Sequence, residues 1–308
     1  MTWFRRIAFF LALNVVVVVT ISLVANLLGI QPYLTSKGLN YGSLIAMCLL
    51  WGMGGSFISL MLSKVMAKWM MGVKIIDPNT HDPEARTLVE TVHRLARQAG
   101  LRKMPEVGYY DSPEVNAFAT GPTKNNSLVA VSSGLLRSMD KRSVDGVLGH
   151  EVAHIANGDM VTMTLIQGVV NAFVMALARI VAFAIDNFLR SKDDEGGGLG
   201  TLGYMAVVFV LELLFFIPGM MIVGYFSRMR EYRADKGGAQ LAGRDNMITA
   251  LRSLQRLHEV NYTPEAQVHQ QPAVASLKIS ASKAGALQKL FSTHPPLEER
   301  IRRLERGL

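Results

Sequence analysis

The segment from Gly149 to Asp186, GHEVAHIANGDMVTMTLIQGVVNAFVMALARIVAFAID, joins two different patterns. Its first residues contain His-Glu-x-x-His, a possible metal-binding motif, and its remainder is strongly apolar. A hydrocarbon core of about 30 Å needs about 20 apolar residues in a helix. The segment therefore predicts a helix with a metal motif that leads directly into a membrane-spanning helix.

The composition of the whole chain also indicates a membrane protein. Half of its 308 residues are hydrophobic, and the mean hydropathy is +0.24. These values are too apolar for an ordinary soluble protein, although the polar remainder is large enough for one compact domain. The single cysteine, Cys48, cannot form an internal disulfide. It lies in an apolar run, where a small buried or lipid-facing residue is expected.

Four apolar runs are predicted to span the membrane. They cover residues 7–30, 41–63, 161–185 and 201–226, and each is long enough for a helix across the bilayer. The first run follows two arginines, as the core of a signal peptide would. Its apolar core is too long for a signal peptide and no clear cleavage site follows, so we expect an uncleaved anchor.

The basic residues predict the orientation of these spans. Residues 64–142 contain 12 Lys and Arg, and residues 228–306 contain 14. The loop between the first two spans has only Lys37, and the loop between the last two has Arg190 and Lys192 beside three acidic residues. The positive-inside rule then places both termini and both polar segments in the cytosol. The net charge of +8 is explained by topology and by attraction to anionic lipid, so nucleic acid is not an expected partner.

The predicted organisation alternates two membrane hairpins with two polar pieces. Residues 1–63 form the first hairpin, 64–160 the first cytosolic piece, 161–226 the second hairpin and 227–308 the second cytosolic piece. The two cytosolic pieces are expected to assemble one mostly helical α+β domain with a small antiparallel sheet.

Local patterns predict the elements of this domain. Apolar spacing and a terminal glycine predict a helix over 82–100, and another helix covers the metal motif at 143–159. Short runs between turn residues predict strands at 106–112, 115–121 and 127–134. Further helices are expected around 231–241, 245–259 and 295–308.

His150 and His154 are four residues apart, so on a helix they share one face, with Cβ atoms about 5–6 Å apart. Two imidazoles in this arrangement can bind one Zn²⁺. Glu151 lies about 100° around the helix and is better placed to reach a water on the metal. It can act as general base and then pass the proton to the leaving amine. The alternative is two surface histidines beside a glutamate.

A catalytic zinc needs a third protein ligand. Glu231 can complete the set, and Asp235, on the same helical face, can accept a hydrogen bond from the outer nitrogen of a ligand histidine. The other histidines remain candidates: His81, His93, His258, His269 and His294. A charged, solvated helix is the alternative for Glu231 and Asp235, because basic residues surround them.

The motifs HEVAH, EYRAD, VNAFATG and HPPLEERIRRL, set among four apolar runs, resemble the HtpX family of membrane zinc endopeptidases. That heat-shock-associated family is related to the CAAX prenyl proteases of the gluzincin group, and the resemblance covers nearly the whole chain. It implies a zincin-like protease domain facing the cytosol at the bacterial inner membrane, with one Zn²⁺ per subunit. The implied substrates are misfolded, damaged or unfolded membrane proteins. The resemblance implies His150, His154 and Glu231 as ligands, Glu151 as base and Asp235 as their support.

Three further residues near these motifs have open roles. Asn116 lies on a strand to which a peptide substrate can add through main-chain hydrogen bonds, or it is an ordinary strand residue. His294, before two prolines, can stabilise an oxyanion or can simply begin the next helix. Arg233 can orient Glu231, bind substrate or remain on the surface.

Two charges fall inside the apolar runs. Charges in a bilayer are costly and often functional. We expect Arg179, near the outer end of the third run, to extend outward to the interface. Glu212, in the middle of the fourth run, is expected to face a polar cavity or to pair within the helix bundle.

The leading hypothesis is a zinc endopeptidase of the cytoplasmic membrane. A transport or metal-handling protein is the second hypothesis, and a non-catalytic scaffold with a zinc site is the third. The histidines and Glu231 fall in cytosolic segments, which disfavours transport, and a structural zinc site has no need of Glu151. The oligomeric state is not predicted.

Overall fold

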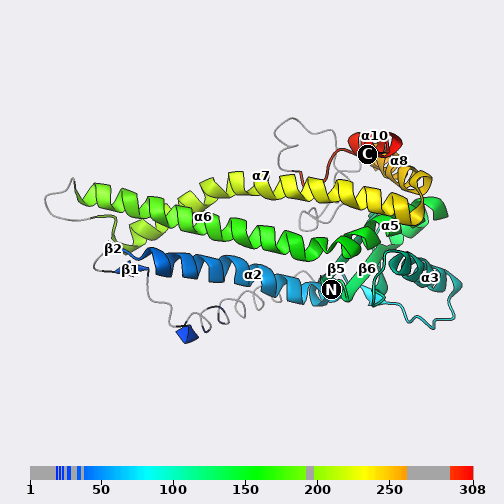
Figure 1. Ribbon diagram of the computed structural model, residues 1–308, viewed down its shortest axis with the longest axis horizontal. Helices are drawn as coiled ribbons and strands as arrows, with labels where there is room; N and C mark the ends of the chain where they lie inside the picture. Colours follow the sequence, from blue (N-terminus) through cyan, green and yellow to red (C-terminus); the bar gives the residue numbers. More distant parts are fainter. Residues whose placement is uncertain are drawn as a thin grey trace. The chain divides into compact units, whose positions relative to one another are not determined.

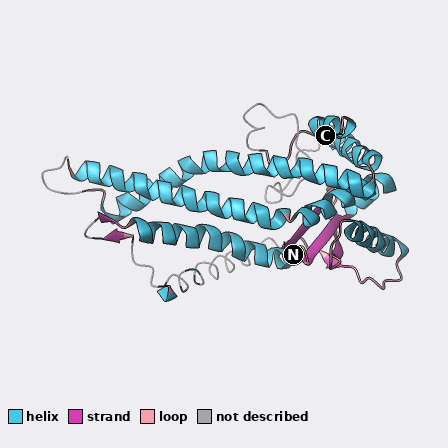
Figure 2. Ribbon diagram, in the orientation of Figure 1, coloured by secondary structure: helices cyan, strands magenta, loops and turns pink. Residues whose placement is uncertain are grey.

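The computed structural model describes residues Val19, Ile21, Leu23, Asn26–Leu28, Tyr33–Thr35, 38–191, 198–261 and 292–307. Most of this described chain is helical, with two small sheets (Figures 1 and 2). The predicted first span lies almost entirely outside the described residues, as does His269, and the side chain of His258 is not described. The first span therefore stays a prediction.

The chain divides into two compact units. The first contains Met1–Ser59 and Met163–Val223, and the second contains Leu60–Thr162 and Gly224–Leu308. Three helices contribute to both units: α2 (Tyr41–Met70), α6 (Asp159–Arg190) and α7 (Gly200–Ala242). Within the described residues, these three are long and apolar enough to cross a membrane.

In the first unit, the apolar parts of α2, α6 and α7 pack together while large side chains such as Phe173 and Phe209 remain exposed, as lipid-facing residues would. A Cβ added at Gly52 of α2 would lie 2.5 Å from the Ala172 nitrogen of α6. Small residues at such contacts are typical of membrane helices. The short strands β1 (Leu34–Thr35) and β2 (Gly38–Leu39) pair before α2.

The two charges in the apolar runs meet each other in this unit. Arg179 Nη1 lies 2.6 Å from Glu212 Oε1 and also donates to the Met175 carbonyl. Glu212 therefore pairs within the bundle, which was one of the two expectations. The expectation that Arg179 extends outward is wrong, because an unpaired carboxylate inside a bilayer is more costly than a buried ion pair.

The second unit is built on a four-stranded sheet of order β3-β4-β6-β5. Its strands are β3 (Lys74–Ile75), β4 (Glu106–Tyr110), β5 (Ala117–Thr123) and β6 (Asn126–Ser132). The predicted sheet was antiparallel, but the observed sheet is mixed, because β4 and β6 are parallel. The reason is that β6 is buried along nearly its whole length and takes a central place. Its hairpin partner β5 is thereby left at the edge of the described sheet.

Helices cover both faces of this sheet. One face packs with α3 (Pro83–Gln98), α5 (Lys141–Asn157), α8 (Arg244–Asn261) and α10 (Leu297–Glu305) in the main core. The end of α2 covers the other face through Ala67. The short helix α4 (Ser133–Ser138) follows β6. Asp82 and Asp140 directly precede α3 and α5, and their side chains cap the first backbone N–H groups of these helices. Helices are present at the four predicted positions around 82–100, 143–159, 245–259 and 295–308, with the observed bounds given above.

Two boundaries near the metal motif differ from the prediction. Helix α5 ends at Asn157, because Gly158 takes a left-handed conformation with φ of 72°. The motif helix therefore does not run directly into the apolar helix. In contrast, the predicted fourth span and the predicted helix around 231–241 are one helix, α7, of 43 residues. The local sequence of 227–230 contains no residue that stops a helix. Glu231 therefore lies on the same helix as the apolar run.

Candidate metal centre

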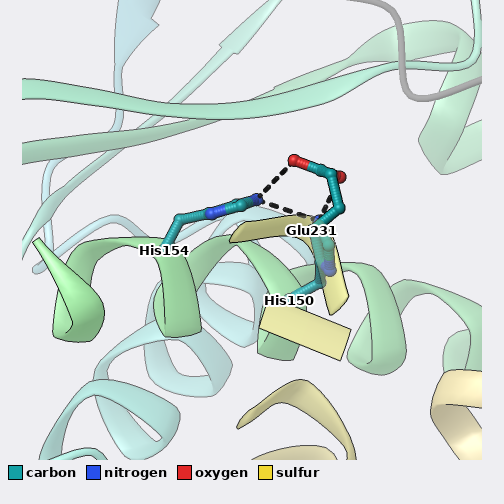
Figure 3. A group of neighbouring side chains, drawn as sticks. All are labelled: His150, His154 and Glu231. Carbon is teal, nitrogen blue, oxygen red and sulfur yellow. Dashed lines mark hydrogen bonds and ion pairs between the residues drawn. The ribbon is translucent and has the colours of Figure 1, made fainter. Parts of the chain in front are cut away.

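Helix α5 presents His150 and His154 on one buried face, next to the last part of α7 (Figure 3). The two helices approach closely at Gly238, where an added Cβ would lie 2.9 Å from the backbone nitrogen of His150. Glu231 lies seven residues before Gly238, which is two turns of the helix. The close approach at Gly238 thus brings Glu231 to the two imidazoles.

The three side chains point at one another within the second unit. The two Nε2 atoms of His150 and His154 lie 3.1 Å apart. Glu231 Oε1 lies 3.3 Å from His154 Nε2, and Glu231 Oε2 lies 3.4 Å from His150 Nε2. One potential ligand atom from each of the three residues lies within 4.8 Å of the other two. The structure therefore brings together the three residues that the sequence predicted as ligands.

The outer nitrogen of His150 contacts Asp235. His150 Nδ1 lies 3.0 Å from Asp235 Oδ1, and Arg300 of α10 makes two hydrogen bonds to the same carboxylate, at 2.6 and 2.8 Å. Burial by itself would raise the pKa of Asp235, but the Arg300 guanidinium lowers it to about 2. Asp235 is therefore ionised and can hold the His150 ring in place by accepting a hydrogen bond from its Nδ1–H group.

The outer nitrogen of His154 contacts a different carboxylate. His154 Nδ1 lies 2.6 Å from Oδ2 of Asp159, the first residue of α6. Arg233 reaches the other oxygen of Asp159 at 3.6 Å. Burial disfavours the charged ring, but Glu231 and then Asp159 raise the pKa of His154 to about 9. Of the three alternatives for Arg233, the structure shows a largely exposed side chain whose guanidinium contacts Asp159.

These contacts fit a divalent metal ion. Each Nδ1 faces a carboxylate and so carries the ring proton, which leaves a lone pair on each Nε2. Two lone pairs and a carboxylate then face one another. Glu231 Oε1 is buried without a hydrogen-bond partner among the described residues. A tetrahedral ion with bonds of about 2.0–2.1 Å separates its ligand atoms by about 3.3 Å, which matches the observed spacing.

His294 joins this group from the loop before α10. Its Nδ1 lies 2.9 Å from Glu231 Oε2, so the structure places it at the site. Glu231 is fully buried between these partners. Burial would raise the pKa of Glu231, but His294, His154 and His150 lower it well below its usual value. Of the other histidines whose side chains are described, His81 is exposed, and His93 of α3 contacts the Pro105 carbonyl.

Glu151 and Asn116, two further predicted site residues, are both buried. Glu151 follows His150 on α5. Asn116 precedes the edge strand β5, and both polar atoms of its amide lack a hydrogen-bond partner among the described residues. Burial raises the pKa of Tyr110, and Asn116 lowers it.

Sequence reasoning missed Arg300 and Asp159. Arg300 carries a signal in the sequence, because it lies on the apolar face of an amphipathic helix with Leu297, Ile301 and Leu304. A charge on that face requires a buried partner. Asp159 carries a weaker signal, since it directly follows the glycine that ends the motif helix.

Comparisons with known proteins show the family of the chain and a similar fold. The family described as Peptidase family M48 matches residues 82–307. Protease HtpX of Shewanella pealeana is 52% identical over 300 residues, which cover 97% of this chain and 99% of the relative. Protease HtpX homolog of Paracidovorax citrulli is 49% identical over 302 residues, covering 98% of each chain.

The crystal structure of S. mikatae Ste24p has a similar fold, with a TM-score of 0.59 and 17% sequence identity. The match covers 85% of this chain and 58% of that chain. The family match extends over the motif helix, the last part of α7 and α10, and three apolar helices accompany it. The chain therefore belongs to peptidase family M48 and is a membrane-embedded metalloprotease.

Proposed function

We propose that this metalloprotease is a zinc-dependent endopeptidase that hydrolyses peptide bonds of misfolded or damaged membrane proteins. The observation that carries the proposal is the convergence of His150, His154 and Glu231 beside the buried Glu151. Two imidazoles and one carboxylate leave a fourth position open, as in catalytic zinc sites, whereas structural sites usually close with four protein ligands.

Each polar residue of the site has a distinct proposed role. His150, His154 and Glu231 hold the metal, and Asp235 with Arg300 keeps the Nδ1 proton on His150. When bound, zinc supplies a Lewis acid that polarises the scissile carbonyl and makes water acidic enough to be deprotonated near neutral pH. Glu151 takes the proton of the attacking water and passes it to the leaving amine. His294 is the proposed stabiliser of the oxyanion, and its contact with Glu231 supports this position.

The edge strand β5 is the proposed docking strand for substrate. A peptide that adds to β5 binds through main-chain groups, which suits a protease of broad sequence range acting on unfolded polypeptides. Asn116, directly before this strand, has a buried amide without a hydrogen-bond partner among the described residues, and we assign it to the peptide-contacting group. The sheet order, with β5 outside β6, supports the proposal.

The proposed location is the bacterial inner membrane, with the site and both termini in the cytosol. The distribution of basic residues supports this orientation. His154 lies five residues before Asp159, where the apolar helix α6 begins, which supports a metal centre close to the cytosolic surface of the bilayer. We include the first apolar run in the proposal, as a fourth span. Transport is not favoured, because the chain belongs to a peptidase family.

The deciding experiment is the zinc content of the full chain purified in detergent, for wild type and Glu231→Ala. The proposal predicts one zinc per wild-type subunit and a large loss in Glu231→Ala. Equal and substoichiometric zinc in both proteins would remove zinc and Glu231 from the proposal. The Glu90→Ala variant, which alters an exposed residue of α3, serves as the control for loss of a carboxylate.

A further inference from the structure

Both predicted histidine ligands have the same kind of support. Each Nδ1 contacts an aspartate, and each aspartate contacts an arginine: His150 with Asp235 and Arg300, and His154 with Asp159 and Arg233. The first set comes from α5, α7 and α10. The second set includes the first residue of α6, a helix whose remaining sequence is apolar enough to cross a membrane.

We infer that Asp159 is a positioning residue for the metal ligand His154 and so makes the start of α6 part of the metal centre. This inference rests on the proposed metal function of His154. The contact itself is short, with 2.6 Å between His154 Nδ1 and Asp159 Oδ2. A ligand histidine whose outer N–H is held by a carboxylate has a fixed ring orientation and a more basic metal-binding nitrogen.

Asp159 does not behave as an ordinary acidic residue at the start of a helix. Such residues stabilise the helix dipole from an exposed position. Asp159 is only 1% exposed, and its Oδ1 atom has no hydrogen-bond partner among the described residues. Its carboxylate is thus turned inward, toward His154, at the cost of leaving one oxygen without a hydrogen bond.

The turn between α5 and α6 brings Asp159 back to the histidine. Gly158 has φ of 72°, and its N–H bonds to the carbonyls of His154 and Ile155. An added Cβ at Gly158 would lie 3.0 Å from Lys124 Cε, and Lys124 Nζ in turn donates to the Ala156 carbonyl. The backbone hydrogen bonds of Gly158 and the contacts of Lys124 hold this turn in place. Asp159 therefore lies next to the last turn of α5.

The two aspartates differ in how firmly they are held. Asp235 receives two short hydrogen bonds from Arg300, which is 1% exposed. Among the described residues, the cation that contacts Asp159 is Arg233, at 3.6 Å and with a side chain that is 62% exposed, and an exposed pair contributes little. The position of Asp159 therefore depends mainly on the first turn of α6. A shift of that turn moves the carboxylate that fixes His154.

The test measures zinc affinity of the full chain in detergent by competition with a chelator. Asp159→Ala should bind zinc about 10- to 100-fold more weakly than wild type. The matched control is Asp245→Asn, because Asp245 is an exposed aspartate in the first turn of α8. It should leave the zinc affinity unchanged. Wild-type zinc affinity in Asp159→Ala would overturn the inference.

A second variant tests the inference if Asp159→Ala does not fold. Asp159→Asn keeps the shape of the side chain but removes its charge, and should show a smaller loss of zinc affinity. The visible spectrum of the cobalt-substituted protein should also change in Asp159→Asn and not in Asp245→Asn. A purely structural role would leave that spectrum unaltered in both. Unaltered cobalt spectra and zinc affinity in Asp159→Asn would overturn the inference.

Glu231→Ala in the same assay separates this inference from the proposed function. Retention of zinc by Glu231→Ala would contradict the proposed ligand set itself. Loss of zinc in Glu231→Ala, with unchanged affinity in both Asp159 variants, would contradict only the role of Asp159. Weaker binding in all three variants supports both.

Discussion

Arg300 and Asp235 form a buried, two-point ion pair directly behind the candidate metal centre, with contacts of 2.6 and 2.8 Å. Arg300 lies on α10 and Asp235 on the last part of α7, 65 residues earlier in the chain. Both side chains are almost fully buried. The pair therefore ties the C-terminal helix to the residue that orients His150.

Removal of Arg300 should destabilise the protein strongly. Arg300→Met leaves Asp235 as a buried carboxylate without its cation, a change that typically costs about 3–5 kcal/mol. The measurement is chemical or thermal unfolding of the metal-free protein in detergent. Arg302→Met is the control, because the Arg302 side chain on the same helix is 61% exposed and should cost less than about 1 kcal/mol. Equal stability of the two variants would contradict the importance of the pair.

Glu151→Gln should separate catalysis from metal binding. The amide keeps the size of the side chain but cannot take a proton, so we expect kcat to fall about 10²- to 10⁴-fold. Zinc content should stay at the wild-type value, because Glu151 is not in the ligand group. The measurement is cleavage of an unfolded membrane-protein substrate together with metal analysis. Wild-type cleavage by Glu151→Gln would show that another group acts as the base.

The metal-free protein should lose stability as pH rises. The fold raises the pKa of His154 from 6.5 to about 9, with Glu231 and Asp159 outweighing burial. Since the folded pKa is the higher one, this contribution is complete below about pH 6.5 and declines through about pH 9. Unfolding of chelator-treated protein at pH 6 and pH 9 measures it.

Zinc should reverse this trend, because it competes with protons for the same nitrogens. The rise in melting temperature on adding zinc should therefore be greater at pH 8 to 9 than at pH 6. A zinc effect that is independent of pH in this range would contradict the assignment of His154 as a ligand.

Gly238→Ala should disturb the metal centre through packing alone. The added Cβ would lie 2.9 Å from the His150 nitrogen and 3.1 Å from its Cα, and neither backbone atom can move freely. Overpacking of this kind costs about 1–3 kcal/mol, and we expect weaker zinc binding as α7 shifts away from α5. Gly55→Ala in α2 is the control, since an added Cβ there meets nothing within 4 Å. Unchanged zinc affinity in Gly238→Ala would show that this approach does not position Glu231.

The sequence predicts the parts of the site that depend on local spacing. His150 and His154 share a face because they are four residues apart, and Glu231 and Asp235 repeat that spacing. The contacts of Arg300 and His294 depend on chain segments more than 60 residues apart, and no local pattern specifies such pairings. The mixed order of the sheet was missed for the same reason, since strand spacing alone does not show that β6 lies between β4 and β5.

The residues of the site come from distant parts of the sequence, so they are synthesised at different times. A nascent chain that has reached the end of α7 already contains both histidines and Glu231. It contains neither His294, which contacts Glu231, nor Arg300, which neutralises Asp235. The complete centre can form only after the last apolar helix and then α10 have left the ribosome. Biosynthesis itself thus delays completion of the candidate site until the segment that follows the apolar helices has been made.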